Sequence, residues 1–174
     1  MTTTDQQVVS ETMAGYYEKA FSSQTADMSY LSDIKSHCNR EVVNKQFTPI
    51  TTEEVYTSLK WLRNRKCAGL DGVHNEMIKL SATNERDYGW DFAEILAKFF
   101  NDLTLKGEFP TSWKSSIIIP AYKKGVATDP ANFRPICLLS CLSKVYTRLL
   151  NARVSKAAEE GGVFTNTQGG GRKF

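Results

Sequence analysis

The sequence contains no apolar run approaching the ~20 residues that a membrane-spanning helix needs. Its first residues, MTTTDQQVVSETM, have neither a basic n-region nor a hydrophobic h-region, so no secretory signal is predicted. Only four cysteines occur among 174 residues, and their scatter gives no disulfide framework. These absences argue against a membrane protein or a disulfide-rich secreted domain, and they favour an intracellular protein of the nucleus or cytoplasm.

Metal-binding patterns are equally scarce. The sequence has no Asp-Asp pair, and its eight Asp residues are scattered. Cys137 and Cys141 are four residues apart with no His or further Cys close by, so we expect buried small side chains rather than metal ligands. His37 beside Cys38 does not complete a ligand set, and His74 follows a turn, where a surface or capping role is expected. We therefore predict no metal site and no cofactor in this chain.

The positive charge is unevenly distributed along the chain. The net charge is +3, but residues 1–55 carry four basic and eight acidic groups, and residues 56–110 carry eight of each. Residues 111–174 carry ten basic and three acidic groups, which gives this last segment a net charge of +7. Such a segment would attract a polyanion, and nucleic acid is the obvious candidate. A solvated basic surface without a ligand is the alternative interpretation.

Residues 109–148 are predicted to contain two extended segments joined by a loop. The β-branched run 117–119 suits a buried strand that ends at Pro120, because proline fits only at the edge or end of a strand. A turn-rich loop is predicted over 123–132. Beyond it, Pro135 favours an extended conformation for the residue that precedes it.

This arrangement would bring three cations together, namely Lys123, Lys124 and Arg134. Arginine can bind phosphate through two parallel hydrogen bonds, and lysine adds a point charge. The segment therefore predicts a phosphate-binding site. A hairpin that only carries solvated cations is the alternative.

Apolar residues recur at helical spacing in five segments: 6–22, 51–64, 74–82, 90–106 and 138–158. Thr51 and Glu54 form a capping-box pattern, with Ile50 placed to pack against Val55. Residues 24–48 are predicted to be a linker with one further helix. The last two helices are expected to supply core residues: Phe92, Ile95, Leu96, Phe99, Phe100 and Leu103 from the first, and Leu142, Val145, Tyr146, Leu149, Leu150 and Val154 from the second.

A glycine-rich turn, 67–72, separates two of these helices. Asp71 is expected to hold the turn by hydrogen bonding to its own backbone, since no second acid lies nearby to share a metal. Three cations precede the turn, Arg63, Arg65 and Lys66. They either complement the C-terminal end of the preceding helix dipole or contact the backbone of a nucleic acid.

Three segments resemble, in this order, the fingers region of non-LTR (LINE-type) retrotransposon reverse transcriptases: GEFPTSWKSSIIIPAYKKG, DPANFRPICLLSCLSKVYTRLL and TQGGGRKF. An upstream segment, RKCAGLDGVHNEMIK, resembles the segment that precedes the fingers in the same family. The resemblance covers roughly residues 50 to 174. It departs from the family pattern at Leu70, where a second proline is usual, and at Gly171, where an aromatic residue is usual.

The resemblance implies an α-rich α+β fold, the fingers subdomain of a right-hand polymerase, with a helical leader at 1–48 and the fingers region at 49–174. It implies that Lys123, or the neighbouring Lys124, and Arg134 contact the triphosphate of the incoming nucleotide. Template contacts are expected from a further set: Arg63, Arg65, Lys66, Lys144, Arg148, Gln168 and Arg172.

The resemblance also implies what this chain would not do alone. Polymerisation needs two metal ions held by carboxylates, which the family supplies from a palm domain that this sequence is expected to lack. Mg²⁺ is therefore expected only for a complete enzyme, with the chain itself binding RNA template and dNTP weakly. A non-catalytic remnant or interaction module that keeps the fingers fold without nucleic-acid binding is the alternative.

Overall fold

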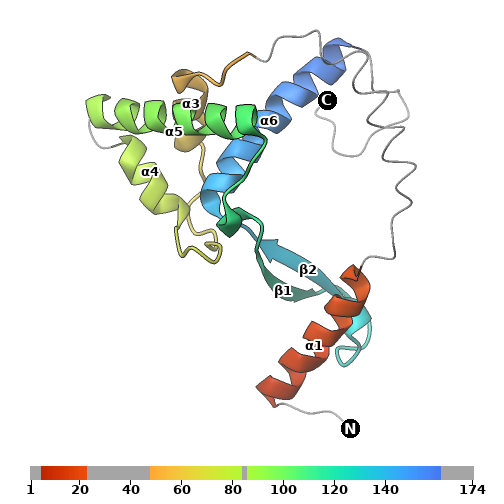
Figure 1. The fold of residues 1–174 in the computed structure, drawn as a ribbon. Coiled ribbons are helices and arrows are strands. Elements are labelled where there is room, and N and C mark those ends of the chain that lie inside the picture. The colour runs from red at the N-terminus through yellow and green to blue at the C-terminus, as the bar shows by residue number, and fades with distance from the viewer. Residues whose placement is uncertain (1–4, 23–47, 84–85, 162–174) are drawn as a thin grey trace. The chain divides into compact units, whose positions relative to one another are not determined.

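The computed structural model describes residues 5–22, 48–83 and 86–161. The predicted linker at 24–48 lies almost wholly outside these residues. The described helices are α1 (Gln6–Phe21), α3 (Thr52–Lys60), α4 (Asn75–Thr83), α5 (Arg86–Lys106) and α6 (Cys141–Glu160) (Figure 1). Strands β1 (Ile117–Tyr122) and β2 (Phe133–Leu138) pair as a two-stranded sheet, and two short 3-10 helices occur, η1 (Thr111–Trp113) and η2 (Pro130–Asn132). The helix-rich α+β prediction agrees with this architecture.

The chain divides into two compact units. The first comprises residues 1–48 and 118–137, and its described part contains α1, most of the hairpin and η2, with α1 in contact with η2. The second comprises residues 49–117 and 138–174 and contains α3 to α6. None of the described helices is both long and apolar enough to cross a membrane.

The core of the second unit lies where α3 contacts α4, α5 and α6. Its largest fully buried side chains include Phe100 and Leu59. The Phe100 ring lies 5.3 Å from that of Tyr146, measured between centroids, and the Tyr146 hydroxyl is 2.9 Å from Thr104 Oγ1. Phe100 and Tyr146 were predicted core residues, and that prediction is confirmed.

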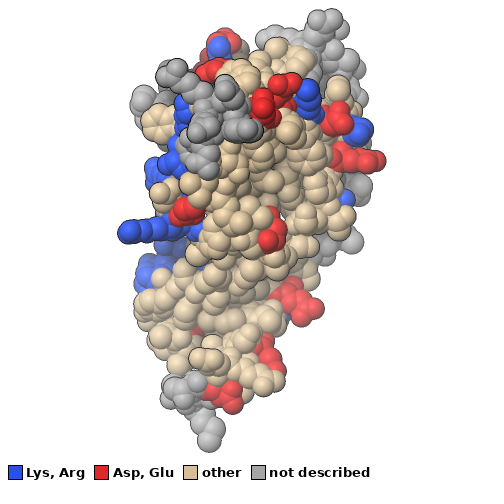
Figure 2. Space-filling view, turned by 90° about the vertical axis from the view of Figure 1, so that its left-hand side faces the viewer, with Lys and Arg blue, Asp and Glu red and all other residues tan. Residues whose placement is uncertain are grey.

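Several side chains that were predicted to be buried are exposed. Ile95 is 63% exposed and Val154 is 66% exposed, because each lies on the flank of its helix that no other described element covers, and Phe99 is 37% exposed. Cys137 is exposed on β2, whereas Cys141 is buried as expected. Most of the face drawn in Figure 2 carries neither acidic nor basic side chains.

The capping box at the start of α3 is confirmed. The Glu54 N–H donates to Thr51 Oγ1 at 3.2 Å, and the Thr51 N–H donates to Glu54 Oε2 at 2.8 Å. Ile50 and Val55 are both buried in the core, as the predicted packing of these two residues requires. The helix ends at Lys60, four residues before the predicted end, with Trp61 as its C-cap, and further along the chain Arg65 adopts a left-handed conformation with φ +57°.

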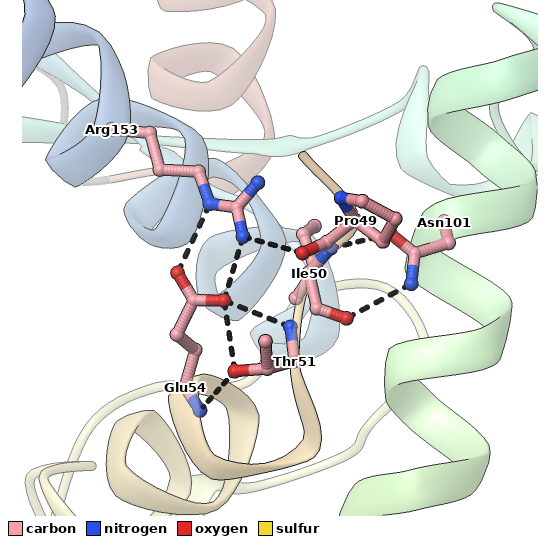
Figure 3. Close-up of polar contacts among 6 residues, drawn as sticks. All are labelled: Pro49, Ile50, Thr51, Glu54, Asn101 and Arg153. Carbon is pink, nitrogen blue, oxygen red and sulfur yellow. Dashed lines mark hydrogen bonds and ion pairs between the residues drawn. The ribbon is translucent and has the colours of Figure 1, made fainter. Parts of the chain in front are cut away.

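A polar clamp joins the start of α3 to α5 and α6 (Figure 3). Arg153 of α6 donates from Nε to Glu54 Oε1 at 3.0 Å and from Nη2 to Glu54 Oε2 at 2.6 Å. Its Nη2 also donates to the Pro49 carbonyl at 2.8 Å. Asn101 of α5 accepts from the Ile50 N–H at 2.7 Å and donates to the Ile50 carbonyl at 2.9 Å. The clamp thereby satisfies backbone groups just before α3 that would otherwise lack partners within the helix.

The clamp should make the stability of the second unit depend on pH. The Arg153 guanidinium holds the pKa of the Glu54 carboxyl below its ordinary value, with help from Thr51 and against the opposing effect of partial burial. Because the folded pKa is lower than the unfolded pKa, the stabilisation is fully present above the unfolded value of about 4.3 and is lost as the pH falls through the folded value.

We therefore expect urea unfolding to show that the wild-type chain loses on the order of 1 kcal/mol more stability than Glu54→Gln between about pH 6 and about pH 3. The effect is small because both side chains are partly exposed to solvent. The glutamine keeps an acceptor but does not titrate, so other carboxyl groups affect both proteins equally. Parallel pH profiles for the two proteins would contradict the expectation.

Candidate phosphate-binding site

The β-hairpin has a register fixed by two contacts near its loop. The Lys123 N–H donates to the Asn132 carbonyl at 2.9 Å, and the Tyr122 and Phe133 rings meet edge to face with centroids 5.5 Å apart. Lys123 therefore faces Asn132 across the hairpin, and two residues further along each strand Ala121 faces Arg134.

This register explains why β1 continues beyond Pro120, where the strand was predicted to end. Pro120 faces Pro135, and in an antiparallel pair this position alternates with the hydrogen-bonded ones. The backbone nitrogens of both residues point away from the partner strand, so the missing N–H groups break no bond between the strands. The strand was also predicted to be buried, which is wrong, since Ile117, Ile118 and Ile119 are 39%, 37% and 43% exposed.

The hairpin places Lys123 and Arg134 on one face. Side chains alternate between the two faces of a strand, so Lys123 and Arg134 are diagonal neighbours across the two strands. Such neighbours lie about 7–8 Å apart, within reach of long side chains. Both residues are exposed, as is Lys124, which follows in the loop. Tyr122 and Phe133 lie on the opposite face by the same alternation.

The loop between the strands is ordered by its own hydrogen bonds. The Tyr122 hydroxyl donates to the Gly125 carbonyl at 2.7 Å, and Asn132 Nδ2 donates to the Val126 carbonyl at 3.0 Å. Gly125 has φ +94°, which favours glycine, and Asp129 Oδ1 accepts from Ala131 at the start of η2. The prediction of a turn-rich loop is confirmed, and these bonds restrict where Lys123 and Lys124 can lie.

The second unit carries its own group of cations. Arg63, Arg65 and Lys66 are exposed on the segment after α3, whereas Lys144 is half-buried and Arg148 exposed one turn apart on α6. The other two predicted template residues, Gln168 and Arg172, lie outside the described residues. The structure thus distributes the predicted site residues between the two units.

The glycine-rich turn, residues 67–72, follows the basic segment 63–66 and lies against the residues just before α6. Its Asp71 Oδ1 accepts from the Val73 N–H at 3.2 Å, and Gly72 has φ +66°, so the predicted turn held by Asp71 is confirmed. Gly69 lies against the backbone of Leu139 and Ser140, immediately before α6. Burial raises the pKa of the Cys141 thiol in the first turn of α6, Lys144 opposes this rise, and Asp71 and Glu76 add to it.

Sequence reasoning missed two residues of α4. Asn75 Nδ2 donates to the Arg63 carbonyl at 2.8 Å, and Glu76 Oε1 accepts from the Arg65 N–H. An Asn-Glu pair at a helix start is so common that nothing in the composition marks these two as unusual. Their contacts reach back 11 and 12 residues, which a local pattern does not reveal.

The described residues do not fit a catalytic metal pair. Within residues 5–22, 48–83 and 86–161, no three His, Cys, Asp or Glu side chains gather closely enough to hold a metal ion. The chemistry that these residues do offer is cationic: an ordered hairpin with lysine and arginine on one face, and a basic segment followed by a turn that lies against the residues just before α6. Both are suited to phosphate groups.

Comparison with known proteins identifies the family. No protein-family model matches the chain. It is 32% identical over 126 residues to the "Probable RNA-directed DNA polymerase from transposon BS" of Drosophila melanogaster, which covers 72% of the chain and 13% of that protein. It is 28% identical over 149 residues to its counterpart from transposon X-element of the same species, covering 84% and 16% respectively. For the RNA-directed DNA polymerase from mobile element jockey of Drosophila funebris, the values are 30% over 112 residues, 64% and 12%.

All three relatives are named as RNA-directed DNA polymerases, or probable ones, of transposons or a mobile element. The chain belongs to the family of non-LTR retrotransposon RNA-directed DNA polymerases, as its sequence motifs predicted. It spans between 12% and 16% of the length of these three relatives.

Proposed function

We propose that the chain is the fingers region of a non-LTR retrotransposon reverse transcriptase, which binds the phosphates of template and incoming nucleotide. Lys123 and Arg134 would neutralise the nucleotide triphosphate, with Lys124 beside them. The observation that carries this proposal is the hairpin register, which puts Lys123 and Arg134 on one exposed face across an ordered loop. Family membership supports it, since the named relatives are RNA-directed DNA polymerases.

Template binding would fall to the cations of the second unit and to the two residues beyond the described part. These are Arg63, Arg65, Lys66, Lys144, Arg148, Gln168 and Arg172. Contacts of this kind go to the sugar-phosphate backbone, so they would tolerate any sequence and weaken with salt.

In this proposal the chain holds and orients phosphates but does not perform the chemistry. In a complete enzyme, Mg²⁺ held by carboxylates would activate the primer hydroxyl and stabilise the leaving pyrophosphate. This sequence offers no Asp-Asp pair for that purpose, so the metal ligands would come from another part of a complete polymerase.

The proposal is tested by measuring the binding of dATP to the 174-residue chain by titration calorimetry at low salt. The Lys123→Ala, Arg134→Ala double variant should bind at least about tenfold more weakly, because charge-assisted hydrogen bonds contribute roughly 1.5–3 kcal/mol each before solvent screening. A Lys98→Ala, Lys106→Ala variant is the matched control. It removes the same charge from α5, where the two lysines pair with Glu94 and Asp102.

Equal dATP affinity in the hairpin variant and the α5 control would refute the role of the hairpin. A folded chain with no measurable affinity for RNA or dATP would favour the alternative, an interaction module that keeps the fold without binding nucleic acid. Loss of affinity confined to the hairpin variant would support the proposal.

A further inference from the structure

We propose that Glu76 and Asn75 are positioning residues that hold the basic segment Arg63–Lys66 in one conformation, so that its cations face a nucleic-acid backbone. The inference rests on the proposed function and deepens it. It assigns to an acidic side chain a positioning role in nucleic-acid binding, although its negative charge alone would repel phosphate. The ligand is a single-stranded nucleic acid, recognised by its phosphates.

Asn75 and Glu76 bind the backbone of the segment at two positions, residues 63 and 65. Asn75 is 7% exposed, and its Nδ2 donates to the Arg63 carbonyl at 2.8 Å. Glu76 Oε1 accepts from the Arg65 N–H. Both acceptor and donor on the segment are backbone groups, so the side chains of Arg63, Arg65 and Lys66 stay exposed and available.

The backbone at Arg65 shows that this conformation is imposed. Arg65 has φ +57°, and among the described residues it alone adopts a positive φ without being glycine. A left-handed conformation is unfavourable for a side chain with a Cβ and persists only where surrounding contacts hold it. The bonds from Asn75 and Glu76 on either side of residue 64 supply those contacts. A glycine at position 65 would adopt this φ freely but would remove a cation.

Glu76 combines this contact with a charge. The Arg65 N–H lowers the pKa of the Glu76 carboxyl, so the group is ionised at neutral pH. Its other oxygen, Oε2, is shielded from solvent and has no hydrogen-bond partner within the described part of the chain. A glutamine can keep the acceptor at Oε1 and place its NH₂ where Oε2 lies, whereas an alanine loses the acceptor. The two substitutions therefore separate the hydrogen bond from the charge.

The experiment measures the affinity of the 174-residue chain for a fluorescent 20-nucleotide single-stranded RNA, as a function of salt concentration. Glu76→Gln should bind as tightly as the wild type or more tightly, because a negative charge near the phosphates is removed. Glu76→Ala removes the same charge yet should bind about three- to tenfold more weakly. Its slope of log affinity against log salt should also become shallower, because fewer phosphates are contacted at once.

Three further measurements make the outcome unambiguous. The Arg63→Ala, Lys66→Ala variant should weaken RNA binding by about tenfold, which shows that the segment itself contacts RNA. Hydrogen exchange of the peptide containing Arg65 should speed up in Glu76→Ala but not in Glu76→Gln, which reports the conformation of the segment without reference to RNA. Unchanged melting temperatures identify variants in which the fold is intact.

The results separate the failure of this inference from the failure of the proposed function. A wild-type chain that does not bind RNA at low salt refutes the proposed function, and the exchange data then decide the positioning role alone. If the wild type binds but both Glu76 variants bind more tightly, the carboxylate acts only through its charge and the positioning role is overturned. An unaffected Arg63→Ala, Lys66→Ala variant overturns it as well.

Discussion

Phe100→Ala should lower the free energy of unfolding of the second unit by about 3–5 kcal/mol. Phe100 is fully buried, and its ring contacts those of Tyr146, Trp113 and Phe99 at centroid distances of 5.3, 6.5 and 5.9 Å. Removing the ring deletes its buried apolar surface and leaves a cavity between α5 and α6 that rigid neighbours fill only partly. Since domains are stable by about 5–15 kcal/mol, the loss would leave this unit close to unfolding.

Urea denaturation followed by tryptophan fluorescence measures this effect, because Trp113 lies beside the substituted ring. Phe99→Ala is the matched control, since Phe99 is adjacent, of identical chemistry and 37% exposed. It should cost about half as much or less, because much of its surface already contacts water. Equal losses for the two variants would show that the described core does not account for the stability.

Gly69→Ala should be destabilising by about 1–3 kcal/mol, although it adds a single methyl group. An added Cβ would lie 2.6 Å from the Ser140 nitrogen, 2.7 Å from the Leu139 carbonyl carbon and 2.9 Å from the Leu139 oxygen. All three are backbone atoms, so no side chain can rotate away. The glycine-rich turn would have to separate from the start of α6, which carries Lys144.

Gly15→Ala provides the contrasting glycine. Gly15 lies within α1, and an added Cβ there meets nothing within 4 Å. Alanine is a better helix former than glycine, so this variant should be neutral or more stable by about 0.5–1 kcal/mol. Thermal unfolding by circular dichroism compares the two. A Gly69→Ala variant that melts with the wild type would contradict the close approach of the turn to α6.

Much of the fold follows from local patterns. The capping box at Thr51 and Glu54 and the turn held by Asp71 each depend on residues a few positions apart. Such features can be predicted because the physical interaction and the sequence signal are the same. The extended conformation of Arg134 before Pro135 is predictable for the same reason.

The errors arise where burial depends on the partner rather than on the residue. Ile95 and Val154 have helical core spacing, but which flank of a helix is covered depends on how the other helices pack. The isoleucines of β1 resemble a buried strand, yet a two-stranded sheet leaves both faces open. The sequence predicts that the strand ends at Pro120, but a proline within a strand is tolerated where its nitrogen points away from the partner strand. That depends on the register, which the local sequence does not reveal.

In the candidate site, too, some residues can be predicted from the sequence and others depend on tertiary contacts. Lys123 and Arg134 could be proposed from residue type and the family resemblance, and the hairpin register then placed them on one face. Glu76 could not be proposed, because its contact with the Arg65 backbone joins positions 11 residues apart. The sequence indicates which basic side chains can bind phosphate. The conformation of the segment that carries them depends on an acidic residue, Glu76, and an uncharged one, Asn75.

The facing prolines of the hairpin have a consequence for how this protein meets others. A two-stranded sheet with exposed isoleucines would ordinarily be prone to pair with strands of other chains along its edges, as in amyloid fibrils. Pro120 and Pro135 interrupt the outer margin of each strand at the same level, so a third strand would find a gap in donors whichever side it approached. The prolines thereby disfavour the addition of a third strand to either edge of the hairpin.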